Sequence, residues 1–162
     1  MGVVIKKMET DEEIRGKARV ACQAWHETYP GLISQDYLDT VTVEKCEKAA
    51  YDHPWNTFVA KDGERVVGFV FFGEDKEDAS VGEIFALYVL KEYYGTGLGR
   101  RLMDAALEQL RDHASVRVWA VKGNARAIRF YEKCGFRLDG EEKYADRLSA
   151  AEVRLTLEKQ YQ

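Results

Sequence analysis

The sequence predicts a single α/β domain spanning residues 1–162 and built on a mixed sheet. Residues 81–90 form a nearly continuous apolar run rich in β-branched and aromatic side chains, which is typical of a strand buried on both faces. After them, apolar side chains recur with the spacing of one helical face, at Leu98, Leu102, Met103, Ala106, Leu107 and Leu110. A further strand follows this helix, so the connection is a parallel crossover and is expected to be right-handed.

The remaining elements follow from local signals. Further strands are expected, in chain order, at residues 3–7, 57–60, 66–72, 116–121, 136–140 and 152–157. Further helices are expected at residues 10–29, 34–38, 42–53 and 124–134. Thr10 and Glu13 form a capping-box pattern at the start of the first helix. Its apolar face is expected to carry Ile14, Ala18, Ala21, Cys22, Trp25 and Tyr29. Asp62-Gly63 indicates a hairpin turn, and the boundary between the last two strands, within residues 141–150, is left open.

Composition limits the classes of function. Of 162 residues, 46% are hydrophobic and 32% are charged, and the net charge of −4 gives no electrostatic support for a nucleic-acid partner. The three cysteines, Cys22, Cys46 and Cys134, form no C-x-x-C pair, and the three histidines are scattered, so we expect no metal site and a reducing compartment. No signal-peptide pattern and no apolar run long enough to cross a membrane are visible, which favours a cytoplasmic protein with no membrane partner.

Three alternating glycines, Gly95, Gly97 and Gly99, join the central strand to the long helix. Glycine lets a backbone approach a ligand closely, and the first-turn N–H groups of a helix attract phosphate-type anions. A Walker loop would need Lys and then Ser or Thr after the last glycine, where the sequence has Arg100 and Arg101. The alternative is that the glycines only form a flexible turn before the helix and bind no ligand.

Two motifs resemble the GNAT superfamily of acyl-CoA-dependent N-acyltransferases. The residues after the apolar run IFALYVL read YYGTGLGRRL and resemble the superfamily's acyl-CoA loop, R/Q-x-x-G-x-G/A. The later segment reads NARAIRFYEKCGF and is similar to N-x-x-A-x-x-F-Y-x-x-x-G-F. Together these motifs lie between Val81 and Phe136. The resemblance implies a mostly antiparallel sheet of about seven strands, with helices on both faces and a splay between the fourth and fifth strands.

The resemblance also implies a cofactor, acetyl-CoA, with coenzyme A as the product. Backbone groups of Leu87, Tyr88 and Val89 are expected to contact the pantetheine arm. The residues expected to bind the pyrophosphate are Tyr94, Gly95, Thr96, Gly97, Leu98, Gly99 and Arg100. Asn124 is expected to contact the arm, with a plain helix cap as its alternative role. The chain departs from the pattern at two positions: Tyr94 replaces the usual Gln or Arg, and Trp119 replaces a glutamate that some relatives carry.

Acyl transfer needs an acid for the leaving thiolate, a base for the amine and donors for the oxyanion. Tyr131 is the candidate acid at the thioester sulfur, and its alternative role is helix packing beside Phe130. Glu83 is the candidate base, acting directly or through water, and its alternative role is a strand-end carboxylate or ion pair. The N–H of Val89 is the candidate oxyanion donor. Residues proposed to line the acceptor site are Trp25, Tyr29 and Tyr37, with core packing as the alternative for Trp25.

The predicted function is transfer of an acetyl group from acetyl-CoA directly to a primary amine of a small molecule, a polyamine or a peptide. The main alternative is a non-catalytic acyl-CoA-binding sensor or interaction module, which would keep the glycine loop but would not need Tyr131 or a base. A nucleotide-binding kinase is disfavoured by the missing Lys-Ser/Thr pair. A homodimer through the C-terminal strands is possible on the resemblance alone, and the sequence does not choose among the acceptors.

Overall fold

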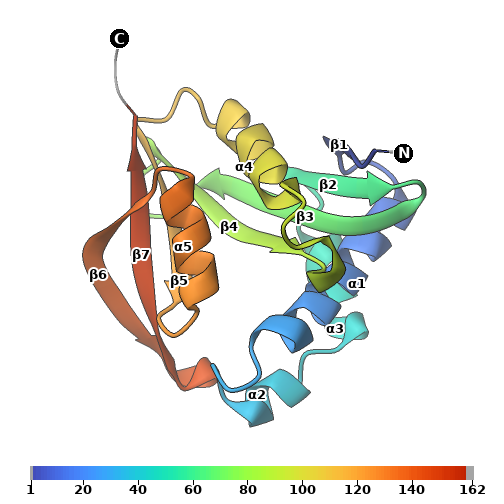
Figure 1. Cartoon of the computed structure of the whole chain (residues 1–162), viewed down its shortest axis with the longest axis horizontal. Coiled ribbons are helices and arrows are strands. Elements are labelled where there is room, and N and C mark those ends of the chain that lie inside the picture. Colours follow the sequence, from blue (N-terminus) through green and yellow to red (C-terminus); the bar gives the residue numbers. More distant parts are fainter. Residues whose placement is uncertain (1, 160–162) are drawn as a thin grey trace.

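The computed structural model describes residues 2–159 (Figure 1). The strands are β1 (Val4–Lys7), β2 (Thr57–Asp62), β3 (Arg65–Glu74), β4 (Val81–Val89), β5 (Ser115–Val121), β6 (Arg137–Ala145) and β7 (Ala150–Glu158). The α-helices are α1 (Asp11–Thr28), α2 (Gln35–Asp39), α3 (Val43–Asp52), α4 (Leu98–Gln109) and α5 (Ala125–Lys133). Two short 3-10 helices, η1 (Lys91–Tyr93) and η2 (Asp146–Leu148), complete the order of elements.

The seven strands form one mixed sheet in the order β1-β2-β3-β4-β5-β7-β6. All neighbours are antiparallel except β4 and β5. This parallel pair is short, because it joins Val81–Ile84 to Ser115–Val118 and ends there, although both strands continue. The predicted α/β fold with a splay between the fourth and fifth strands is therefore confirmed.

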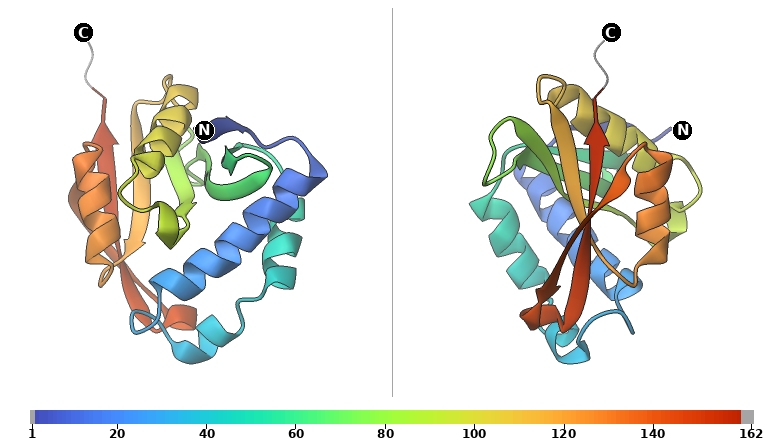
Figure 2. Two further views of the ribbon diagram at one scale, coloured as in Figure 1. Left: turned by 45° about the vertical axis from the view of Figure 1, so that its right-hand side comes forward. Right: turned by 90° about the vertical axis from the view of Figure 1, so that its left-hand side faces the viewer.

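Helices cover both faces of the sheet (Figure 2). On β3, a Cβ atom at Gly68 would meet Leu102 of α4 at 3.2 Å, whereas the next residue, Phe69, faces the Lys17 amine of α1. Since successive strand residues point to opposite faces, α1 and α4 pack on opposite sides of β3. Figure 1 shows α3 beside α1, and α5 lying against β5 and β7.

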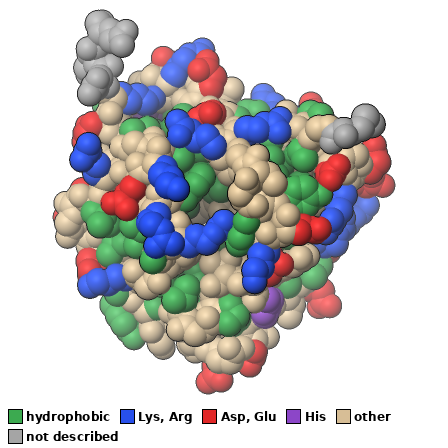
Figure 3. Space-filling view, in the orientation of Figure 1, with side chains coloured by type: hydrophobic (Ala, Val, Ile, Leu, Met, Phe, Trp, Pro, Cys, Tyr) green, Lys and Arg blue, Asp and Glu red, His purple; other side chains and the backbone are tan. Residues whose placement is uncertain are grey.

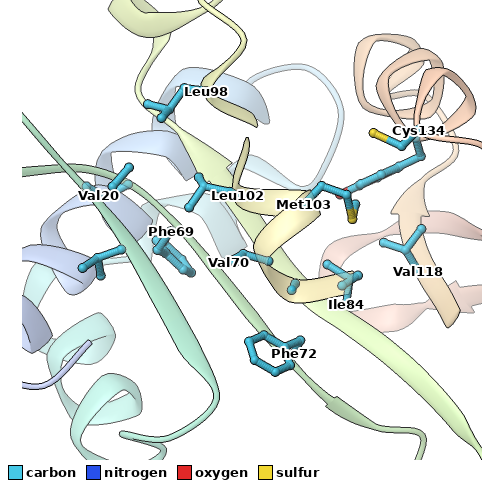
Figure 4. Close-up of a cluster of buried hydrophobic side chains, with 14 of the residues drawn as sticks. Val20, Phe69, Val70, Phe72, Ile84, Leu98, Leu102, Met103, Val118 and Cys134 are labelled. Atoms are coloured by element: carbon cyan, nitrogen blue, oxygen red, sulfur yellow. The ribbon is translucent and has the colours of Figure 1, made fainter. Parts of the chain in front are cut away.

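The main core lies between α4 and the sheet (Figure 4). Leu102, Met103 and Ala106 are fully buried there, so the predicted apolar stripe of α4 is confirmed. Val70 of β3, Ile84 of β4 and Val118 of β5 belong to the same cluster. Fully burying one such side chain stabilises the fold by about 1.5–3 kcal/mol.

The buried face of α1 is wider than the predicted one. Ala18 and Tyr29 are buried and Ile14, Ala21 and Trp25 pack partly buried against the core, as expected. The other buried residues of this helix are Glu13, Gly16, Lys17, Val20 and Ala24. Gly16 packs closely on β3, since an added Cβ would lie 2.5 Å from Cγ2 of Val66. The charged side chains of Glu13 and Lys17 lie on the same buried face, each in a different environment.

Lys17 lies over aromatic rings. Its Nζ is 4.6 Å from the centroid of Phe71 and 5.3 Å from that of Phe69. Burial lowers the pKa of Lys17 to about 8, because removing water from an ammonium group favours the neutral form. The aromatic faces offset part of this loss.

Glu13 is held by hydrogen bonds. It accepts from Lys6 Nζ at 2.7 and 2.8 Å, from Lys61 Nζ at 3.2 Å, and from the N–H groups of Glu9 and Thr10 at 2.8 and 3.0 Å. Burial alone would raise its pKa, but these donors outweigh burial and lower the pKa to about 2. The predicted capping box is therefore present, and it is joined to β1 and β2.

Two strand predictions need correction. The strand β4 is not buried on both faces along its length, since its second half borders the splay and Phe85 is 37% exposed. The strand β6 runs to Ala145, beyond the predicted Gly140, and η2 with Ser149 in the left-handed region (φ 52°) makes the turn into β7. The open boundary between the last two strands therefore lies at residues 146–149.

No helix among residues 2–159 combines the length and the apolar character needed to cross a membrane. Within the same residues, His, Cys, Asp and Glu form no group of three or more that could hold a metal ion.

The Glu13 network predicts a pH-dependent contribution to stability. Glu13→Gln is expected to lower the free energy of unfolding at pH 7 by up to about 3 kcal/mol, because each pKa unit corresponds to about 1.4 kcal/mol. Since the folded-state pKa is depressed from 4.5 to about 2, this stability is fully present above pH 4.5 and is lost as the pH falls toward 2. Denaturant unfolding at pH 7 and pH 3 measures the difference, and Glu12→Gln on the exposed side of the same turn is the control. Equal losses for the two variants would contradict the assignment.

Candidate functional site

A cleft of about 920 Å³ lies where β4 and β5 separate. It is lined by the second half of β4, η1, the start of α4, β5, α5 and the end of α1. Figure 3 shows Lys and Arg side chains gathered around a hollow on this face. Among residues 2–159, the charged residues that line the cleft are Glu27, Lys91, Arg100, Arg126, Arg129 and Lys133. The cleft is therefore locally basic, although the chain as a whole is acidic.

The glycine loop opens onto this cleft. Gly95 and Gly97 have φ values of 78° and 82°, in the left-handed region that side chains other than glycine rarely adopt. Gly97 is the N-cap of α4 and has no side chain with which to cap it, so the first-turn N–H groups stay available. Gly99 has a different role: a Cβ there would lie 3.2 Å from the ring of Phe130 on α5. Two glycines thus set the backbone path, and the third lets α4 approach α5.

The edge of β4 also faces the cleft. Leu90 donates its N–H to the carbonyl of Val67 at 3.0 Å. Because the bonding direction alternates along an antiparallel strand, the amide of Tyr88 also faces β3, and the amides of Leu87 and Val89 face the other way. On that side β5 has already separated from β4. Leu87 and Val89 therefore present backbone groups to the cleft, and Tyr88 reaches it with its side chain.

Three tyrosines line the cleft near the end of α1. The hydroxyls of Tyr29 and Tyr88 are 2.9 Å apart and hydrogen-bonded. Tyr131 of α5 is 7% exposed, and burial raises its pKa above the ordinary value, with a further rise caused by Tyr29. Burial also raises the pKa of Tyr88. All three phenols therefore stay protonated at neutral pH, and hydrogen bonding among residues 2–159 leaves the Tyr131 hydroxyl free.

The predicted acceptor residues are only partly brought together. Tyr29 lines the cleft, whereas Trp25 and Tyr37 pack behind it, with ring centroids 4.6 Å apart for Trp25 and Tyr29 and 6.0 Å apart for Trp25 and Tyr37. The Tyr37 hydroxyl accepts a hydrogen bond from Arg147 of η2 at 2.8 Å. Helix α2 and the β6–β7 turn therefore meet at this end of the cleft, and the N–H of Ser34 donates to the carbonyl of Leu148 at 2.7 Å.

Asn124 and Tyr94 both line the cleft, and each makes a contact within the protein. The Asn124 side chain accepts from the N–H of Ala127 at 3.2 Å, so its role as a helix cap is established whatever else it contacts. The Arg126 guanidinium stacks on the Tyr94 ring, with its central carbon 3.3 Å from the ring centroid. Trp119 lines the cleft too, and Lys143 Nζ lies 4.1 Å from the centroid of its ring.

Glu83 lies outside the group of described residues that line the cleft. It is paired with Gly73 on one side and with Arg117 on the other, in the part of β4 that is still bonded to β5. Burial raises the pKa of Glu83 to about 7, and the neighbouring Asp75 carboxyl adds to the rise. Arg117 is 3.8 Å from Asp75. Glu83 thus belongs to a small charged cluster at the closed end of the splay, and Tyr131 belongs to the open end.

Most of the chain matches a known protein family. Residues 19–136 match the description "Acetyltransferase (GNAT) family". The chain belongs to the GNAT acetyltransferase family. One relative, "Uncharacterized N-acetyltransferase YuaI" from Bacillus subtilis, is 31% identical over 132 residues, which are 75% of this chain and 73% of the relative. A "Probable N-acetyltransferase Rv2775" from Mycobacterium tuberculosis is 28% identical over 122 residues, covering 72% of this chain and 70% of the relative.

Solved structures share the fold of this GNAT protein. The protein PH1933 from Pyrococcus horikoshii superposes with a TM-score of 0.78 at 23% identity, over 99% of this chain and 100% of the other. The PaiA N-acetyltransferase from Thermoplasma acidophilum, solved with coenzyme A, gives 0.74 at 21% identity, over 98% and 100%. Family membership makes this chain an acetyl-CoA-dependent N-acetyltransferase, so the predicted enzyme class and cofactor are confirmed.

Sequence reasoning missed the cations that α5 contributes to the GNAT cleft. Arg126, Arg129 and Lys133 follow one another by three and four residues, which places them on one helical face, and that spacing was visible in the sequence. The stacking of Arg126 on Tyr94 and the hydroxyl pair of Tyr29 and Tyr88 join distant segments and had no local signal.

The contact between Gly99 and Phe130 predicts coupled stability. Alanine is favoured over glycine inside a helix by about 0.5–1 kcal/mol, but overpacking of the new methyl group against the ring costs about 1–3 kcal/mol, so Gly99→Ala is expected to lower the free energy of unfolding. The loss of stability caused by Gly99→Ala should be smaller in a Phe130→Leu background, because the ring is absent there. Denaturant unfolding of the two single variants and the double variant measures the coupling, and Gly2→Ala, where a Cβ meets nothing within 4 Å, is the control. The same loss in both backgrounds would show that the contact is not the cause.

Proposed function

We propose that this GNAT protein transfers the acetyl group of acetyl-CoA directly to a primary amine of a small molecule, a polyamine or a peptide. The observation that carries the proposal is that one cleft joins an uncapped helix start, a free strand edge and a buried tyrosine whose hydroxyl has no hydrogen-bond partner among residues 2–159. Its volume of about 920 Å³ suits a large ligand. The cofactor supplies the acetyl group as an activated thioester.

The glycine loop and the β4 edge are the proposed cofactor-binding parts. The backbone N–H groups of Gly95, Gly97, Leu98, Gly99 and Arg100 bind the diphosphate, since they combine free donors with the positive end of the α4 dipole. The N–H groups of Tyr94 and Thr96 in the same loop already donate to the carbonyls of Lys91 and Tyr93, at 3.0 and 3.4 Å. Leu87 and Val89 offer backbone groups to the pantetheine arm along the open edge of β4. Asn124 borders the same path.

Tyr131 is the proposed general acid. The phenol is protonated at neutral pH and can donate to a leaving thiolate, although burial raises its pKa and makes it a weaker acid than an ordinary tyrosine. The N–H of Val89 is the proposed donor to the carbonyl oxygen as that oxygen gains negative charge. Burial raises the pKa of the Cys134 thiol, which also lines the cleft, so this cysteine stays protonated. That favours direct transfer over an acyl-cysteine route.

Glu83 is the proposed base, acting through water because it lies outside the cleft lining. A carboxyl group with a pKa of about 7 is near the value at which general bases work best at neutral pH. A water chain without Glu83 remains the alternative base, and the pH profile below distinguishes the two.

The acceptor is proposed to bind beside Tyr29 and Tyr88, with Trp25 and Tyr37 supporting Tyr29 from behind. The names of relatives support an amine without choosing one. A "Probable spermine N(1)-acetyltransferase" from Bacillus subtilis subsp. natto is 28% identical over 109 residues, covering 62% of this chain and 70% of the relative.

The first test is thiol release from acetyl-CoA against a panel of spermidine, free amino acids and peptides with free N-termini. At least one amine is expected to give turnover, and Tyr131→Phe is expected to lower kcat by about 10²-fold, as loss of a general acid does. Coenzyme A should still raise the Tm of Tyr131→Phe, because the variant keeps the phosphate site. Binding without turnover on any amine would favour a non-catalytic acyl-CoA module, and full activity of Tyr131→Phe would remove it as the acid.

The second test is the pH dependence of kcat/KM. With Glu83 as the base, the rate is expected to rise as the pH increases through about 7, where the carboxyl group ionises. Asp75→Asn removes a neighbour that raises this pKa, so the rise should move to lower pH. The unmodified protein and Asp75→Asn are assayed with the same acceptor, so ionisation of the amine affects both pH profiles equally. Unchanged profiles for Asp75→Asn and Glu83→Gln would leave the water chain as the base.

A further inference from the structure

The contact between Tyr94 and Arg126 joins the two walls of the cleft. Tyr94 directly precedes the glycine loop, and Arg126 lies in the first turn of α5. The guanidinium carbon is 3.3 Å from the centroid of the Tyr94 ring, and both residues line the cleft. An arginine this close to a ring is stacked on it, so the contact fixes the position of an otherwise long and mobile side chain.

Stacking leaves the donors of Arg126 unused. The guanidinium N–H groups lie in its plane, so a ring on its face does not satisfy them. Within residues 2–159, Arg126 makes no ion pair, whereas Arg100, the arginine of the loop itself, pairs with Asp104 at 3.1 Å. Arg126 is therefore a cation that is held in place and has open donors, and Arg100 is already partly neutralised.

This arrangement explains the departure at Tyr94. The loop motif usually begins with Arg or Gln, and here an aromatic ring stands at that position. The ring cannot donate to a phosphate from its face, but it can hold a donor that another helix supplies. The amides of Gly95 and Gly97 follow Tyr94 at once, so the stacked guanidinium sits beside the proposed diphosphate cradle.

We propose that Arg126, positioned by the Tyr94 ring, binds the diphosphate of the acyl-CoA and replaces the side chain that the loop lacks. The inference rests on the proposed cofactor site. It assigns Arg126 a binding role and Tyr94 a positioning role. Planar arginine is suited to this task because its paired donors match phosphate oxygens.

The test is the Kd of the purified protein for three ligands, measured by calorimetry: coenzyme A, dephospho-coenzyme A, which lacks the 3′-phosphate, and pantetheine, which lacks all phosphates. Arg126→Ala is expected to raise the Kd for coenzyme A and for dephospho-coenzyme A by the same factor, about tenfold or more, as loss of a hydrogen bond between charged groups does. Pantetheine binding should not change. If Arg126→Ala weakened the binding of coenzyme A but not of dephospho-coenzyme A, Arg126 would be assigned to the 3′-phosphate and the diphosphate assignment would be overturned.

The positioning role of Tyr94 has its own variants. Tyr94→Ala should weaken coenzyme A binding, Tyr94→Phe should restore it because the ring face remains, and Tyr94→Ala should add little in an Arg126→Ala background. The affinity of Arg126→Lys for coenzyme A should lie between those of the unmodified protein and Arg126→Ala, because lysine keeps the charge but cannot stack as a plane on the ring. The inference would be contradicted if the losses of affinity from Tyr94→Ala and Arg126→Ala added in the double variant. It would also be contradicted if Tyr94→Phe bound coenzyme A as weakly as Tyr94→Ala.

Arg137→Ala, an exposed arginine of β6 outside the cleft lining, controls for the loss of one positive charge and should bind coenzyme A normally. If the unmodified protein fails to bind coenzyme A, the proposed cofactor site is wrong. If it binds coenzyme A but Arg126→Ala binds equally well, only this inference is wrong.

Discussion

The short parallel pairing of β4 and β5 is the constraint on which the rest of the structure depends. Only the first part of each strand is bonded to the other, Val81–Ile84 to Ser115–Val118. Parallel neighbours require a crossover, and here the crossover is α4, which begins just beyond the carboxyl end of β4. The helix start therefore lies at the same end at which the strands separate. A free strand edge, a cleft and a source of unpaired N–H donors follow together from one break in the pairing.

The charge of the site shows why whole-chain charge is a poor guide to a ligand. The net charge of −4 gives no support for an anionic ligand, yet the cleft gathers Lys91, Arg100 and the cations of α5. The acidic residues are concentrated elsewhere, for example in the first turn of α1. Since exposed charges more than about 10 Å apart are largely screened at 0.1 M salt, a bound phosphate responds mainly to the local set.

Periodicity was sufficient for α4, whose stripe from Leu98 to Leu110 is buried as the 3.6-residue spacing predicts. On α1 it found only part of the buried face, because Glu13 and Lys17 are also buried there and Gly16 packs closely on Val66, a contact that no spacing within the helix encodes. The motifs likewise located the loop and Tyr131 in one cleft. They did not give the contact of Arg126 with Tyr94, since a pair formed between distant segments depends on how α5 docks. Local patterns therefore predicted the elements, and tertiary contacts decided what their side chains meet.

The two proposed proton-transfer groups occupy different environments on either side of the splay. Tyr131 belongs to α5, whereas Glu83 lies on β4, paired with Gly73 and beside Asp75. Burial raises both pKa values, but the consequences are opposite: the phenol is held protonated as a donor, and the carboxyl, at about 7, ionises near neutral pH as an acceptor. The strands are unbonded only beyond Ile84, so that opening is where the proposed thioester can lie along the free edge of β4. The break in pairing that opens the proposed cofactor site therefore begins just after Ile84, the neighbour of Glu83, and Tyr131 lines the cleft that it opens.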